Sequence, residues 1–179
     1  MKFLKGCLIA ILIFGGIITS LIFIYNRKIS KEVIQENEKP KKSLTEYKNK
    51  ISERNNLIIN SNLSDSLKIL AKKSHSILKN SKKINDNLWT EYSINQKLYE
   101  NESFKKINEE LNEKYIQYNS DAQEFNSRWI SFPSNIALTN NNLRSYEIMY
   151  SIAYGNDNSE NMIKRKKVDH WIKTGEVIE

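Results

Sequence analysis

Residues 7–25 form an uninterrupted apolar run, CLIAILIFGGIITSLIFIY, and no charged residue occurs between Gly6 and Asn26. Nineteen residues rising about 1.5 Å each make a helix of about 28 Å, close to the roughly 30 Å thickness of a hydrocarbon core. A helix also bonds its backbone amides internally, as lipid requires. We therefore predict a transmembrane anchor at 7–25, preceded by a short N-terminal flank at 1–6.

A cleaved signal peptide is the main alternative for this run. Its apolar stretch is longer than the usual 7–15 residues, and no A-x-A-like cleavage site follows it. Cys7 lies at the start of the run rather than after its end, which argues against a lipoprotein cleavage site. Arg27 and Lys28 come directly after Tyr25-Asn26, as at an interfacial stop. We expect an uncleaved, single-pass anchor in the cell membrane.

The side of the membrane on which the remainder lies stays open. Lys2 and Lys5 flank one end of the anchor, while Arg27, Lys28 and Lys31 flank the other. The positive-inside rule favours a cytoplasmic C-terminal domain. A short Lys-bearing N-terminus before an apolar run also resembles a signal anchor, which would export that domain.

Composition favours helices for the rest of the chain. Five Gly and two Pro supply few turn residues, and a single cysteine excludes an intrachain disulfide. The net charge of +7 is concentrated in two basic runs, Lys39-Pro40-Lys41-Lys42 and Lys164-Arg165-Lys166-Lys167. Such runs are either solvated or, near a bilayer, attractive to anionic head groups.

Helix signals divide the chain further. We expect a charged connector at 26–42 in which Pro40 interrupts any helix leaving the membrane. Ser43 and Glu46 form a capping box for a helix whose apolar face is Leu44, Tyr47 and Ile51.

Two longer stripes follow at alternating spacings of three and four residues, the period of helices that pack along one another. The first contains Leu63, Leu67, Leu70, Ser74, Ile77, Ser81, Ile84 and Leu88. A polar break at 100–103 predicts a reversal. The second stripe contains Phe104, Ile107, Leu111, Tyr115, Tyr118, Ala122, Phe125, Trp129 and Phe132, and Pro133 ends it. Aromatics at this spacing predict core packing rather than a ligand site.

The predicted fold is all-α: an N-terminal transmembrane helix followed by an elongated antiparallel three- to four-helix bundle. We place the bundle at 43–154, with residues 136–154 as a possible fourth, shorter element. A basic tail at 155–179 begins with a loop and contains a short helix bearing Val168, Trp171 and Ile172.

The sequence contains no recognisable catalytic pattern. His75 and His170 lie far apart, with no zinc-binding spacing around them, and we expect surface histidines. Glycine-rich phosphate loops are absent, and Glu109-Glu110 fits a solvated helix face. We therefore predict no enzyme, and no catalytic, cofactor-binding or metal-binding residue, cofactor or small-molecule substrate.

Several short motifs resemble the LemA family of bacterial membrane-anchored helical proteins. The stretch 54–60, RNNLIIN, is similar to that family's R-x-D-L-I-P-N motif, with Asn56 in place of the acid and Ile59 in place of the proline. N-E-x-F, Y-N, N and F-P motifs follow in the family's order, although the chain is about one heptad shorter between Leu111 and Tyr118. The matching positions are Arg54, Leu57, Ile58, Asn60, Asn101, Phe104, Tyr118, Asn119, Asn126, Phe132 and Pro133.

The resemblance covers roughly residues 20–143 and implies a helical bundle without an established molecular role. Its polar motif residues are either helix caps and buried hydrogen bonds or a binding surface. The first hypothesis for function is a membrane-anchored binding or scaffold protein of the bacterial envelope. It contacts lipid through residues 7–25 and a protein partner or a second copy of itself. The alternative is a basic module that associates with anionic lipid or nucleic acid, of which nucleic acid is the less favoured.

Overall fold

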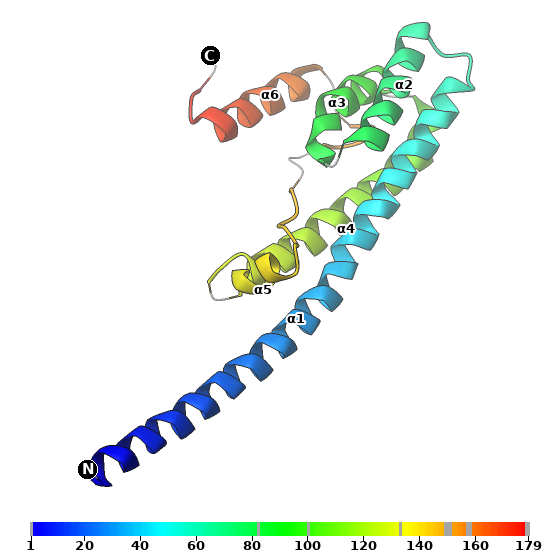
Figure 1. Cartoon of the computed structure of the whole chain (residues 1–179). Coiled ribbons are helices and arrows are strands. Elements are labelled where there is room, and N and C mark those ends of the chain that lie inside the picture. Colours follow the sequence, from blue (N-terminus) through cyan, green and yellow to red (C-terminus); the bar gives the residue numbers. More distant parts are fainter. Residues whose placement is uncertain are drawn as a thin grey trace. The chain divides into compact units, whose positions relative to one another are not determined.

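The computed structural model describes residues 2–81, 83–99, 101–132, 134–148, 152–156 and 159–177, and the side chains of residues 2–12 and some of α6 lie outside that description. All regular structure in these ranges is helical (Figure 1), which confirms the all-α prediction. The elements are α1 (Lys2–Ile59), α2 (Asp65–Asn80), η1 (Ile84–Asn87), α3 (Leu88–Lys97), η2 (Glu102–Phe104), α4 (Lys105–Trp129), α5 (Asn135–Asn140) and α6 (Ser159–Thr174).

The predicted interruption at Pro40 is wrong, because α1 runs through it without a break. Proline removes one backbone donor and disfavours a helix interior, but tertiary contacts routinely override local propensity. The predicted capping box is also wrong, because Ser43 and Glu46 lie inside α1 and not at the start of a helix. The Ser43 hydroxyl donates to the Pro40 carbonyl at 3.2 Å inside the helix, and the Glu46 carboxylate accepts from Lys114 at 2.6 Å.

The first long stripe does not form one helix. α2 ends at Asn80, and Ser81 is extended, with φ −94° and ψ 137°. The Ser81 hydroxyl donates to the Lys83 carbonyl and accepts from the Lys83 amide, at 3.1 and 3.0 Å. Serine competes in this way with helical hydrogen bonding. The helix therefore gives way to a turn before η1 and α3.

The second stripe is confirmed along α4. Its apolar positions from Phe104 to Trp129 are buried or half-buried. The helix, however, ends at Trp129. Phe132 is therefore outside it and 79% exposed, so its assignment to the buried stripe is wrong. Pro133 lies outside the described residues.

The C-terminal part contains less helix than expected before residue 155 and a regular helix after it. Within 136–154 only the short α5 forms, and the described residues 143–148 and 152–153 have no regular structure. The expected basic helix in the tail is present as α6.

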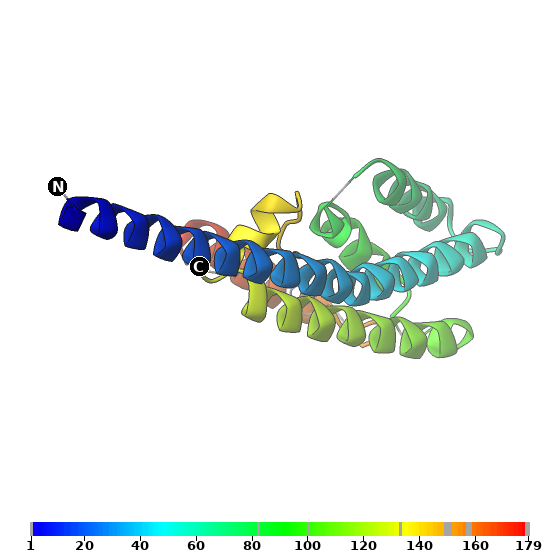
Figure 2. The same ribbon diagram turned by 60° about the horizontal axis from the view of Figure 1, so that its bottom comes forward.

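The chain separates into two compact units, residues 1–39 with 125–145 and residues 40–124 with 146–179. In the second unit, α1 and α4 run antiparallel. Glu46 pairs with Lys114 at 2.6 Å and Lys50 pairs with Glu110 at 2.7 Å, so the later residue on α1 meets the earlier one on α4. Figure 2 shows the two helices side by side. In the first unit the buried apolar side chains are Val33, Phe125, Trp129, Ala137 and Leu138.

Among the described residues, no helix holds a stretch that is both long and apolar enough to span a membrane. The predicted anchor starts at Cys7, and the side chains of residues 7–12 lie outside that description.

Candidate functional site: a buried polar network beside a cleft

A carboxylate lies at the centre of the second unit. Glu91 on α3 is fully buried, and one of its oxygens, Oε1, accepts from Arg54 Nη2, Ser74 Oγ and Asn87 Nδ2 at 2.9 to 3.0 Å. Its other oxygen accepts from the Tyr154 hydroxyl at 3.0 Å. The four donors come from α1, α2, η1 and the segment 152–156. One side chain therefore ties together four separate parts of the chain.

Arg54 is the counterion of Glu91 and is equally buried. Its Nη2 and Nε also donate to Asn55 Oδ1 at 2.8 and 3.3 Å, and its guanidinium lies 5.7 Å from the centre of the Tyr154 ring. Burial, the largest single effect, lowers the pKa of Arg54, but the charge and hydrogen bond of Glu91, together with Tyr154 and Tyr47, raise it above its ordinary value. Arg54 therefore stays charged inside the unit.

Two phenols complete the network. The hydroxyls of Tyr47 and Tyr154 are hydrogen-bonded to each other, and both side chains are buried. Burial, aided by the negative charge of Glu91, raises the pKa of both phenols well above the ordinary value. Both phenols therefore remain neutral, and the Tyr154 hydroxyl can donate to Glu91.

The segment around Tyr154 is fixed through its backbone by two asparagines. Asn112 on α4 donates to the Tyr154 carbonyl at 3.0 Å and accepts from the Tyr154 amide at 2.9 Å. Asn95 on α3 donates to the Ala153 carbonyl at 2.9 Å and accepts from the Gly155 amide at 2.8 Å. We call Asn95 and Asn112 the asparagine clamp. It satisfies four backbone groups of a segment that has no helix or strand to do so.

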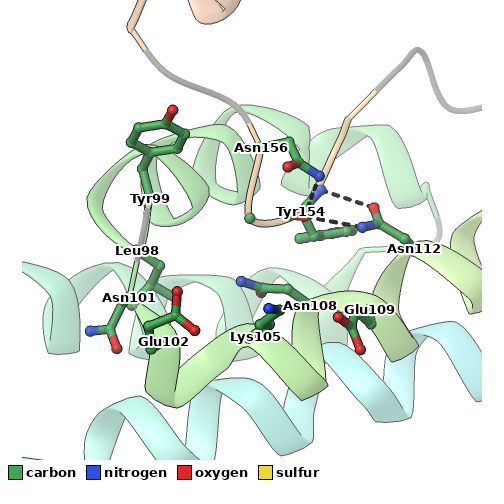
Figure 3. A pocket seen from close by; sticks show the side chains of 11 residues that line it. Leu98, Tyr99, Asn101, Glu102, Lys105, Asn108, Glu109, Asn112, Tyr154 and Asn156 are labelled. Carbon is green, nitrogen blue, oxygen red and sulfur yellow. Dashed lines mark hydrogen bonds between the residues drawn. The ribbon is translucent and has the colours of Figure 1, made fainter.

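Beside the clamp is an open cleft of about 320 Å³. Figure 3 shows its side chains around the backbone of Tyr154. Gly155 has φ +78°, a conformation that favours glycine, and a Cβ there would lie 3.1 Å from Asn108 Nδ2, closer than most Cβ contacts. The cleft is lined by Leu98, Tyr99, Asn101, Glu102, Lys105, Asn108, Glu109, Asn112, Tyr154, Gly155 and Asn156.

The motif residues predicted from the sequence do not form one site. Arg54 belongs to the buried network, while Asn101 accepts from the Ser103 amide at 3.1 Å and also lines the cleft. The Tyr118 hydroxyl donates to the Glu147 carbonyl at 2.5 Å. Of the others, Ile58 and Phe104 are buried, Asn119 and Asn126 are half-buried, and Leu57, Asn60 and Phe132 are exposed.

Sequence reasoning missed Glu91, Asn95, Asn112 and Tyr154. One signal was available, since Ser74 occupies a core position of an apolar stripe. A small polar residue there implies a buried polar partner. Nothing in the spacing identified that partner, which is contributed by another helix.

The network is built to hold structure rather than to act on a substrate. Both oxygens of Glu91 are occupied by donors of the same chain, and the group has no exposed surface. In the described part of the chain, no three His, Cys, Asp or Glu side chains are grouped as a metal site would require. His75 is half-buried, with its Nε2 3.1 Å from Asn56 Oδ1.

Comparison of the chain with models of protein families, with curated proteins and with solved structures gives no match. Membership of the LemA family therefore stays a prediction.

Proposed function

We propose that the chain is a membrane-tethered binding protein, held in the bilayer by residues 7–25, whose cleft receives a polar segment of a protein partner. The observation that carries the binding role is the cleft wall at 154–156, which the asparagine clamp and the Glu91 network hold in place. A LemA-like antiparallel helical bundle, proposed from the order of the sequence motifs, is the framework for this role.

The side chains at the end of the apolar run support the tether. Every large apolar residue from Ile13 to Tyr25 is exposed, by 52% to 68%, although the helix is regular throughout. A helix that is apolar on all sides needs an apolar environment. Lipid provides that environment for residues 7–25.

The cleft supports binding because its geometry is set before a partner arrives. Pre-organised groups lose less conformational entropy on association. The carboxylates of Glu102 and Glu109 outnumber the single ammonium group of Lys105, and asparagine amides supply both donors and acceptors. This combination suits a short peptide segment that presents a lysine or arginine side chain.

Site-specific photocrosslinking in intact cells tests the proposal. A benzoylphenylalanine at Glu109, in the cleft, is compared with one at Gln123, which is also exposed on α4 but outside the cleft. We expect a discrete protein adduct from position 109 alone, and its loss in a Glu102→Lys background. Absence of an adduct at position 109, or the same adducts from both positions, would refute the binding role of the cleft.

One observation favours the alternative function. On α6 the cations Lys164, Lys166 and Lys167 are exposed, next to exposed Val168 and Trp171. Such a helix can associate with anionic lipid. Flotation of the chain without residues 2–25 with phosphatidylglycerol vesicles measures this association. The association with vesicles should weaken with salt and in the Lys164→Glu/Lys167→Glu variant. Binding to DNA in the absence of vesicles tests nucleic acid, the less favoured partner.

A further inference from the structure

The corner between α4 and α5 carries an unusual group of exposed apolar side chains. Ile130 is 50% exposed, Phe132 is 79% exposed and Ile136 is 45% exposed. Single exposed hydrophobic residues are ordinary, whereas exposed hydrophobic residues that lie together are typical of surfaces that contact a protein or a membrane. We call these three residues the apolar corner.

The sequence around the apolar corner is also free of charge. No Asp, Glu, Lys or Arg occurs between Arg128 and Arg144, in a chain of which 27% is charged. Charged side chains are the residues that the hydrocarbon layer excludes most strongly. The gap is therefore what a segment in contact with lipid would need.

Within the first unit, the corner lies beside the end of the proposed anchor. A cavity of about 240 Å³ is lined by Tyr25, Lys28, Ile29 and Glu32 of α1 together with Arg128, Trp129 and Ser134. Figure 2 shows α5 next to the part of α1 that follows the anchor.

Two polar contacts hold α4 at this level of α1. Trp129 Nε1 donates to Glu36 Oε2 at 2.7 Å, and Arg128 pairs with Glu32 at 3.4 Å. The start of the corner is thereby fixed to the first helical turns beyond Tyr25.

The neighbouring surface of α1 has the composition of a membrane interface. Phe23 and Ile24 share a shallow depression with Arg27, Lys28 and Lys31. Aromatic side chains at the boundary and cations just beyond it are typical of the level of the lipid head groups.

We propose that the apolar corner inserts into the interfacial layer of the bilayer next to the anchor, as a second membrane contact of the same unit. The proposal rests on the proposed anchor at 7–25. The corner is confined to the head-group region, because the polar groups of its own irregular backbone are excluded from hydrocarbon. Two contacts, in place of one, would restrict rotation of the first unit about the anchor.

Depth-dependent fluorescence quenching tests this inference on the full chain in phosphatidylcholine–phosphatidylglycerol vesicles. Single cysteines at Phe132, Ile17 and Ile116, each in a Cys7→Ser background, are labelled with the same environment-sensitive fluorophore. Ile116 is the matched control, because it is apolar and 64% exposed but belongs to the second unit. Quenchers are lipids that carry a spin label near the head group or deep in the acyl chain, and aqueous iodide.

We expect the label at 132 to be quenched by the shallow spin label and shielded from iodide at least several-fold relative to that at 116. The label at 17 should respond most to the deep spin label. If position 132 is as accessible to iodide as position 116 while position 17 is shielded, the corner inference is wrong and the anchor stands. If position 17 is accessible to iodide, the anchor is wrong and the corner inference fails with it.

Discussion

The pair Arg54–Glu91 provides the most demanding test of the buried network. Both side chains have no exposed surface, and their closest atoms are 2.9 Å apart. Arg54→Met leaves the carboxylate with three uncharged donors, those of Ser74, Asn87 and Tyr154. Glu91→Gln leaves a buried guanidinium facing a neutral amide.

Each single substitution should cost about 3–5 kcal/mol, the usual penalty for leaving one charge of a buried pair uncompensated. The double variant removes both charges, and the glutamine retains an oxygen that can accept from the neighbouring donors. Replacing a buried pair by neutral groups is often close to neutral in stability. We therefore expect the double variant to be less destabilised than the sum of the singles by at least about 2 kcal/mol.

Urea unfolding of the full chain in detergent micelles, followed by helical circular dichroism, measures this double-mutant cycle. Ser76→Ala, at an exposed position of α2 outside the network, serves as the control with an expected change within about 0.5 kcal/mol. Additive effects of the two substitutions, or single-variant costs below about 1 kcal/mol, would refute the assignment of Arg54 and Glu91 as a coupled pair.

Three further predictions follow from the same unit. Gly155→Ala should destabilise the protein more than Gly175→Ala in thermal unfolding, because both positions have φ near +75° but only the first faces Asn108; the left-handed conformation alone costs about 1–2 kcal/mol. Glu46→Lys should lower the melting temperature, and Glu46→Lys/Lys114→Glu should restore it if α1 and α4 are antiparallel in this register; an unrestored double variant would contradict the pairing. The raised pKa of Tyr47, Tyr118 and Tyr154 means that the unfolded state releases tyrosine protons first, so the stability of the protein is full below about pH 10 and falls above it. Denaturation midpoints and tyrosinate absorbance between pH 8 and 11 measure this. Ionisation of all nine tyrosines near pH 10 in the folded protein would contradict the raised pKa of these three residues.

Regular spacing made one part of the fold predictable. The stripe from Phe104 to Trp129 keeps intervals of three and four residues, and its positions on η2 and α4 are buried or half-buried. Local signals were misleading where tertiary contacts decide the outcome. Pro40 carries a strong helix-breaking preference, yet α1 continues through it, while Ser81 ends a helix that its stripe would have extended.

The polar network could not have been predicted from spacing. Three of the four donors to Glu91 are 37, 17 and 63 positions away in the sequence, and no local pattern connects such positions. The asparagine clamp has the same origin, because Asn95 and Asn112 meet a segment about sixty and forty residues later in the chain. Asparagine is abundant throughout the sequence, so neither residue is distinguished by its type.

Hydrogen exchange at the amides of Tyr154 and Gly155 tests the central claim, a cleft wall fixed to the helices, most directly. Both amides lie outside helices and strands and donate to the side chains of Asn112 and Asn95. Measured on the full chain in lipid nanodiscs, they should exchange as slowly as amides in the middle of α4. Exchange at the rate of an unstructured peptide would show that the segment is not held, and the cleft would lose its wall.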